Sequence, residues 1–223
     1  MIFELRQAPA EVIGGKAAGL ARLQELGLPV PPAVVLPVGA ELEDPEEVVN
    51  RIGEPIAVRS SAVGEDARDR SAAGQYETLL GIRKDTLADA IAHVRASTER
   101  ARAYGGETEI AVVLQRQVAA TKAGAAFSHD PMTGDDAAVV ECAFGSGEAV
   151  LSGQVTPDRY RVVNGQIHAR VTGPLRTLRA DELERLLELV RCAEEGFGHP
   201  VDVEFCFERT KLWLLQCRPI TSV

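Results

Sequence analysis

The sequence predicts an α+β fold built from two lobes. Three observations support this prediction: short β-prone runs dominate the second half of the chain, amphipathic helical runs lie beside them, and Gly105-Gly106 interrupts the pattern between the halves. We therefore expect an N-terminal lobe over residues 1–106 and a C-terminal lobe over residues 107–223, which together form one domain around a cleft. A length of 223 residues is sufficient for a core of this kind.

Apolar periodicity and breaker residues define the elements of the first lobe. Ala17, Leu20 and Leu23 recur on one stripe of a helix, which Gly27 and the prolines after it end. Asp85 suits the N-cap of a second helix. In chain order we expect a helix over 16–26, a strand over 33–38, a short helix or loop over 41–54, a strand over 55–63, a loop over 64–77, a strand over 78–82 and a helix over 85–104.

Strands make up most of the second lobe. Asn164-Gly165 is a strong hairpin signal, and Gly196 and Gly198 are expected to end an amphipathic helix. In chain order we expect strands over 109–118, 122–131 and 137–153, a hairpin over 159–171, a helix over 181–198 and a second hairpin over 201–220.

Composition and charge narrow the class of protein. The chain is 45% hydrophobic and 26% charged, as in soluble globular proteins, and its net charge of −9 argues against nucleic-acid binding. Glu4 and Arg6 fall where a signal peptide needs an apolar run, and no run approaches the ~20 residues of a membrane span, so we expect a cytoplasmic protein without membrane contact. Four cysteines without a CxxC pair are expected to be buried, reduced thiols: Cys142, Cys192, Cys206 and Cys217.

The segment VDVEFCFERTKLWLLQCRPI, residues 201–220, carries polar side chains within apolar strands. We predict a hairpin with a turn at Arg209-Thr210, in which Glu204 lies opposite Gln216 and Asp202 lies opposite Arg218. Glu204 and the Gln216 oxygen suit Mg²⁺, and Arg218 suits a phosphate. The alternative is a cross-strand salt bridge from an acid to Arg218. Strict alternation would place four residues on one face of the return strand: Leu212, Leu214, Gln216 and Arg218.

Three further features point to an anionic ligand. Lys16 follows two glycines at a helix start, where backbone N–H groups favour anions. Arg59 emerges at the end of an apolar strand, and the loop around Gly74 has small residues that let its backbone approach a phosphate chain. Each feature has an ordinary alternative: a solvated lysine, a structural ion pair and a surface turn. Together with the Mg²⁺-capable pair, they indicate a nucleoside triphosphate site.

Eight ordered motifs carry a resemblance to a known family. They are GGKAAGLARL, GLPVPPAVVL, IAVRSSAVGED, SAAGQYETLLGI, VVLQRQV, AFSHDPMTG, FGSGEAVLSGQVTPDRY and DVEF with LWLLQCRPIT. From about residue 11 to residue 221, the chain resembles the N-terminal ATP-binding domain of phosphoenolpyruvate synthase, pyruvate phosphate dikinase and rifampin phosphotransferase. The resemblance implies an ATP-grasp fold whose two lobes hold ATP with Mg²⁺.

The resemblance also implies the site residues. They are Lys16 and Arg59 at the phosphates, Gly74 and Thr78 bordering ATP, Gln115 at the adenine pocket, Glu148 near the ribose, Glu204 and Gln216 on Mg²⁺, and Arg218 on a phosphate. Of these, Lys16, Arg59 and Arg218 are the expected catalytic residues.

Members of this family transfer the β-phosphoryl group of ATP to a histidine on a swivelling domain, with AMP and phosphate as the other products. The resemblance therefore implies an ATP-dependent, dikinase-like phosphotransferase whose phosphorylated histidine lies on a separate partner protein or domain. Two alternatives remain open: direct phosphorylation of a small molecule, and a non-catalytic ATP-binding regulatory module. No swivelling-domain segment is recognisable, and we expect all four histidines to be structural or solvated: His93, His129, His168 and His199.

Overall fold

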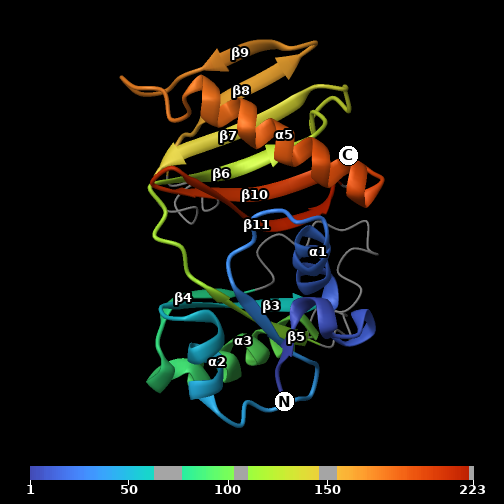
Figure 1. Cartoon of the computed structure of the whole chain (residues 1–223), viewed down its shortest axis with the longest axis vertical. Coiled ribbons are helices and arrows are strands. Elements are labelled where there is room, and N and C mark those ends of the chain that lie inside the picture. The colour runs from blue at the N-terminus through green and yellow to red at the C-terminus, as the bar shows by residue number, and fades with distance from the viewer. Residues whose placement is uncertain (63–76, 103–109, 146–154, 221–223) are drawn as a thin grey trace. The chain divides into compact units, whose positions relative to one another are not determined.

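The computed structural model describes residues 1–62, 77–102, 110–145 and 155–220, and its contacts divide the chain into two compact units (Figure 1). The first unit comprises Met1–Ala21 and Pro31–Gln117, and the second comprises Arg22–Val30 and Val118–Val223. The predicted lobe boundary at Gly105-Gly106 falls outside the described residues and stays a prediction. No helix among the described residues has the length and apolar character to cross a membrane.

The first unit is built on a five-stranded antiparallel sheet with the strand order β1-β2-β5-β3-β4. Its strands are β1 (Phe3–Glu4), β2 (Ala33–Leu36), β3 (Ile56–Ala62), β4 (Thr78–Ile82) and β5 (Ile110–Arg116). Its helical elements are the 3-10 turns η1 (Leu5–Gln7), η2 (Ala10–Val12) and η4 (Lys84–Thr86), and the helices α1 (Gly14–Glu25), α2 (Pro45–Ile52) and α3 (Leu87–Arg102). One face of the sheet, with Val58 and Leu114, packs in a buried core with Ile91 of α3.

The second unit is built on a six-stranded antiparallel sheet with the strand order β11-β10-β6-β7-β8-β9. Its elements are β6 (Lys122–Phe127), β7 (Ala138–Phe144), β8 (Asp158–Val163), β9 (Gln166–Arg170), α5 (Ala180–Phe197), β10 (Val201–Glu208) and β11 (Lys211–Pro219). Figure 1 shows α5 lying across this sheet. Lys122 of β6 faces Phe207 in the ladder and forms a buried ion pair with Glu182 of α5. The face of Phe207 is therefore the face that α5 covers.

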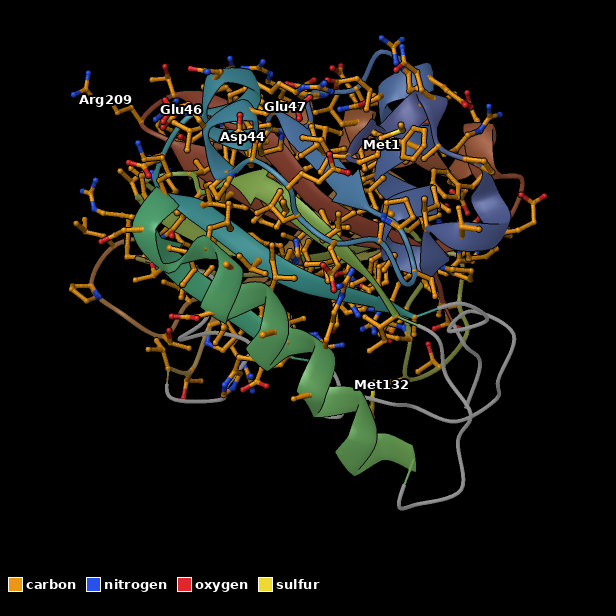
Figure 2. All side chains as sticks on the ribbon, turned by 90° about the horizontal axis from the view of Figure 1, so that it is seen from below. Met1, Asp44, Glu46, Glu47, Met132 and Arg209 are labelled. Carbon is orange, nitrogen blue, oxygen red and sulfur yellow. The ribbon has the colours of Figure 1, made fainter. Side chains whose placement is uncertain are left out.

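The capping residues of α2 explain why this segment, for which the sequence predicted either a short helix or a loop, is helical. Asp44 caps it by accepting a hydrogen bond from the Glu46 backbone N–H at 2.9 Å, and Pro45 occupies the first turn. Glu46 and Glu47 lie in the same turn, where acidic side chains favour the helix dipole. Figure 2 shows Asp44, Glu46 and Glu47 together at the start of α2.

Where the structure describes them, the predicted helices and strands are present, with two local corrections. Residues 64–76 of the predicted loop, 103–104 of the predicted helix and 146–153 of the predicted strand over 137–153 lie outside the described residues. Asp85 is not a helix N-cap, because it lies within η4, where Arg83 and Thr86 exchange hydrogen bonds. Gly196 does not end α5, which continues to Phe197 and closes at the left-handed Gly198. A Cβ on Gly196 would lie 2.3 Å from a methyl carbon of Leu26, so this glycine permits close packing.

Gly14 fixes the start of α1 against β3. Its φ of +72° is in the left-handed region, and a Cβ there would lie 2.4 Å from the carbonyl oxygen of Ser61. Three residues further along α1, the Ala17 N–H donates to the Ser61 hydroxyl at 3.0 Å. Both contacts hold the turn that contains Lys16 against the end of β3.

Asp158 is a buried carboxylate that ties residues after β9 to the start of β8. It accepts hydrogen bonds from the backbone N–H groups and the hydroxyls of Thr172 and Thr177, at 2.8 to 3.0 Å. Burial alone would raise the pKa of Asp158, but these hydrogen bonds outweigh it and hold the pKa below its usual value.

Replacement of Asp158 is expected to give a pH-dependent loss of stability. Asp158→Asn should lower the free energy of unfolding at pH 7 by about 1–3 kcal/mol, since it removes an ionised acceptor from buried donors. The folded pKa lies below the unfolded value of about 3.9, so the stabilisation is complete above that value and is lost as the pH falls through the folded pKa. Denaturant unfolding at several pH values should show that the difference in unfolding free energy between the wild type and Asp158→Asn narrows below about pH 4. A gap that stays constant at acid pH, or an equal loss in the exposed control Asp89→Asn, would contradict this account.

Gly14 offers a second stability test with a matched control. Gly27 has nearly the same φ, +71°, but nothing lies within 4 Å of the position of its Cβ. Gly27→Ala should therefore report backbone strain alone, at about 1 kcal/mol. Gly14→Ala adds overpacking against Ser61 and should cost about 1–3 kcal/mol more. Equal unfolding midpoints for the two variants would show that the contact with β3 is not tight.

Candidate functional site

A β-bulge in the hairpin of β10 and β11 sets the register of the polar side chains. The hairpin turns at Arg209-Thr210, as predicted, and Figure 2 shows the Arg209 side chain pointing outward from this turn. From the turn, the ladder pairs Glu208 with Lys211 and Phe205 with Leu214, then shifts by one residue and pairs Glu204 with Gln216 and Asp202 with Arg218. Leu215 is the extra residue, and both predicted polar pairs are confirmed.

The bulge decides which face these side chains occupy. Directly opposite residues share a face, so Gln216 and Arg218 lie on the face of Glu204, while Leu214 lies with Phe205 on the face of α5. The prediction that Leu212 and Leu214 share a face with Gln216 and Arg218 is wrong, because it assumed uninterrupted alternation. Without the shift, Glu204 would face Leu215, and Gln216 would point towards α5.

Asp202 holds the Arg218 guanidinium from the neighbouring strand. Nε and Nη2 of Arg218 both lie 2.8 Å from Oδ2 of Asp202, so the salt bridge that the sequence left as an alternative is present. The Asp202 side chain is 9% exposed and the Arg218 side chain is 53% exposed, which leaves the cation accessible to a ligand. Burial raises the pKa of Asp202 above its usual value, and the positive charge of Arg218 offsets part of that rise.

Arg59 is the centre of the polar face in the first unit. Thr78 lies directly opposite Arg59 on β4, and the two therefore share a face. Arg59 Nη1 donates to Gln115 Oε1 at 3.4 Å, which joins Gln115 of β5 to the same group. This is the face opposite the core that contains Val58 and Leu114.

The backbone beside Lys16 is anchored to this face by Ser61, a residue to which the sequence assigned no role. Ser61 lies two residues after Arg59 on β3 and therefore on the same face. Its hydroxyl accepts a hydrogen bond from the backbone N–H of Ala17, the residue after Lys16. The available signal was the alternation of Arg59 and Ser61 within the VRSS motif.

The predicted site residues that the structure describes form two sets, one in each unit. The first set is Lys16, Arg59, Thr78 and Gln115, and the second set is Glu204, Gln216 and Arg218. Gly74 and Glu148 lie outside the described residues.

Glu204 and Gln216 fit the requirements of Mg²⁺ bound together with a phosphate. They present a carboxylate and an amide oxygen from facing positions of neighbouring strands. Among the described residues, no group of three or more His, Cys, Asp or Glu side chains is placed to hold a metal ion. Mg²⁺ is commonly held by one or two protein oxygens plus substrate phosphates, so this donor set suits a nucleotide-bound ion rather than a protein-only cage.

The histidines and cysteines take structural or surface positions. His93 contacts Glu77 at 3.0 Å, His129 contacts Glu194 at 3.1 Å, and His199 contacts the Pro200 carbonyl at 3.1 Å. His168 is exposed on β9. Three cysteines are buried, as predicted, and burial raises the pKa of Cys142 to about 12. Cys192 is exposed on α5, so the prediction that all four are buried is wrong for this one.

Sequence comparison finds relatives that are longer than this chain. The chain is 30% identical to a probable phosphoenolpyruvate synthase of Methanothermobacter thermautotrophicus, with 99% of this chain and 45% of the relative covered. It is 31% identical to the rifampicin phosphotransferase of Bacillus subtilis, with 82% of this chain and 26% of the relative covered. The chain thus spans less than half the length of each of these relatives.

Structural comparison identifies the fold. Crystal structures of an N5-carboxyaminoimidazole ribonucleotide synthetase and of Campylobacter jejuni biotin carboxylase each give a TM-score of 0.52, at 10% and 13% sequence identity. They cover 94% and 93% of this chain, which itself covers 45% and 40% of them. Both are ATP-grasp enzymes, and this chain has the same fold. The profile of the family "Pyruvate phosphate dikinase, AMP/ATP-binding domain" matches residues 37–174 and 168–223, so this chain belongs to that family.

Proposed function

We propose that the two sets of site residues bind one Mg·ATP, and that the chain catalyses phosphoryl transfer from it to a histidine on another protein or domain. ATP, water and the histidine would give AMP, phosphate and phosphohistidine. Membership of an AMP/ATP-binding family supports the nucleotide. The names of the relatives, phosphoenolpyruvate synthase and rifampicin phosphotransferase, support transfer of a phosphoryl group.

The single observation that carries the proposal is the shared face of Glu204, Gln216 and Arg218. An acid, an amide oxygen and a guanidinium meet there on the strand face that α5 leaves uncovered. Hard oxygens beside a cation are the complement of a metal-bound phosphate, since the metal takes the oxygens and the phosphate takes the guanidinium.

The catalytic roles follow from charge. Bound Mg²⁺ would neutralise phosphate charge, and Glu204 and Gln216 would hold it. Arg218, oriented by Asp202, would stabilise the charge that develops on the transferred group. Lys16 and Arg59 would hold the phosphate chain, and the anchoring of the Lys16 turn by Ser61 would keep both on one face of the first sheet.

The environments of the histidines support an acceptor outside this chain. The imidazoles of His93 and His129 pair with carboxylates, and the imidazole of His199 contacts a backbone carbonyl. His168 lies on β9, at the opposite edge of the six-stranded sheet from β11, which carries Gln216 and Arg218.

Removal of the Glu204 charge is expected to weaken Mg·ATP binding. Glu204→Gln keeps the shape of the side chain but removes the negative charge that would balance the metal, which should cost about 1.5–3 kcal/mol, or about tenfold to hundredfold in Kd. Isothermal titration with a non-hydrolysable ATP analogue, with and without Mg²⁺, measures the effect. Glu188→Gln, an exposed carboxylate on α5, is the matched control and should bind as the wild type does. Equal affinity in both variants would place the metal elsewhere.

Product analysis tests the transfer itself. Incubation with Mg·ATP and a histidine-bearing swivelling domain should yield AMP, phosphate and a phosphorylated partner. Arg218→Lys keeps a positive charge beside Asp202 but loses the planar fork of the guanidinium. The transfer rate should fall more than tenfold, because the variant loses a charged hydrogen bond to the transferred group. Arg209→Ala, at the hairpin turn, is the control. ADP as the sole nucleotide product would contradict the proposal and favour direct phosphorylation of a small molecule, and tight binding without turnover would favour a regulatory module.

A further inference from the structure

The AFSHDPMTG segment places a buried serine beside the start of β10. Ser128 is 8% exposed and follows Phe127, the last residue of β6. Phe127 lies directly opposite Asp202 in the ladder. The next step of this antiparallel register brings Ser128 opposite Val201, the first residue of β10. Ser128 therefore lies one ladder position from the carboxylate that holds Arg218.

Ser128 holds Val201 with its side chain as well as its backbone. The Ser128 N–H donates to the Val201 carbonyl at 3.0 Å, as in any antiparallel pair. In a regular pair the return bond goes to a backbone carbonyl, but here the Val201 N–H donates to the Ser128 hydroxyl at 2.9 Å. Val201 is fully buried, so loss of this hydroxyl would remove the acceptor of a donor that water does not reach.

Glu194 in the last turns of α5 fixes the direction of the Ser128 hydroxyl. Ser128 Oγ donates to Glu194 Oε1 at 3.1 Å. An ionised carboxylate only accepts, so the hydroxyl proton points to Glu194 and the oxygen lone pairs stay available to the Val201 N–H. His129 Nδ1 lies 3.1 Å from the same Oε1 and is a second contact that holds the carboxylate. The ends of β6 and α5 and the start of β10 thus meet at one hydroxyl group.

The start of β10 receives less support from β11 than from Ser128. At the rung before Asp202 on that side, the Ile220 N–H donates to the Pro200 carbonyl at 3.0 Å. Proline has no N–H, so Pro200 cannot return a second bond. The backbone that leads into Asp202 is therefore held by one bond on the side of β11 and by two bonds to Ser128 on the side of β6.

We propose that Ser128 is a positioning residue for the proposed phosphoryl transfer. By holding Val201 it fixes the backbone of Asp202, which in turn holds Nε and Nη2 of Arg218, each at 2.8 Å from one carboxylate oxygen. The inference rests on the proposed function for the role of Arg218. A guanidinium that stabilises a transition state must be held in one direction, since a displacement of about 1 Å can cost about hundredfold in rate.

The Nε–H resonance of Arg218 reports this positioning without a ligand or a partner. It is measured by ¹⁵N NMR of the full chain and assigned by its absence from Arg218→Lys. In the wild type it should exchange slowly with water, because Asp202 holds it. Ser128→Ala removes the acceptor of the Val201 N–H, so exchange should become about tenfold faster. Ser128→Thr keeps the hydroxyl and should restore slow exchange.

Thr177→Ala is the matched control for a general loss of stability. Thr177 is 5% exposed and its hydroxyl donates to Asp158 of β8, a strand that β7 and β6 separate from β10. This variant should leave the exchange of the Arg218 resonance as in the wild type. The inference is overturned if Ser128→Ala leaves the exchange unchanged, if Thr177→Ala accelerates it equally, or if Ser128→Thr behaves as Ser128→Ala does.

Transfer kinetics then connect the positioning to the reaction. With Mg·ATP and a histidine-bearing swivelling domain, Ser128→Ala should lower the transfer rate per folded chain about threefold to hundredfold. In the Asp202→Asn background the same change should have little further effect, because the carboxylate that it positions is absent. Equal effects in both backgrounds would overturn the inference while the transfer itself stands. If the wild-type chain forms no AMP, the proposed function fails, whereas the NMR comparison still decides whether Ser128 orients Arg218.

Discussion

One extra residue in β11 decides where the chemistry of the second unit lies. Leu215 bulges between Leu214 and Gln216, and this shift turns Gln216 and Arg218 onto the face of Glu204. A regular ladder from the same two-residue turn would point both side chains towards α5, among apolar residues. The bulge is thus the constraint on which the proposed metal-binding pair and the guanidinium both depend, and the buried Asp202 then fixes the guanidinium by a salt bridge.

The polar face of the first unit also depends on backbone geometry, here on strand alternation and an anchored helix start. Strand β3 alternates core residues with Arg59 and Ser61, and its neighbouring strands supply Thr78 and Gln115. Lys16 comes from a helix start, and its placement depends on the Ser61 hydroxyl and on the absence of a side chain at Gly14. Groups built on strands and on an anchored helix start are held more firmly than groups on loops, which suits the proposed triphosphate site.

Much of this arrangement was accessible from the sequence, because it depends on periodicity and turn chemistry. The main helices and strands, the Asn164-Gly165 hairpin and the pairing of Glu204 with Gln216 follow from such local signals. The misplaced Leu214 shows the limit: alternation predicts faces only while the ladder is regular, and a bulge leaves no simple composition signal. The role of Ser61 was missed for a related reason, since it depends on a contact between residues 44 positions apart.

The most direct test of the account is a crystal structure of the chain with Mg²⁺ and a non-hydrolysable ATP analogue. We expect the ion to be coordinated by a Glu204 carboxylate oxygen and by Gln216 Oε1 at about 2.0–2.1 Å, with Arg218 on a phosphate oxygen. A triphosphate and metal bound without Glu204 and Gln216, or on the sheet face that α5 covers, would contradict it.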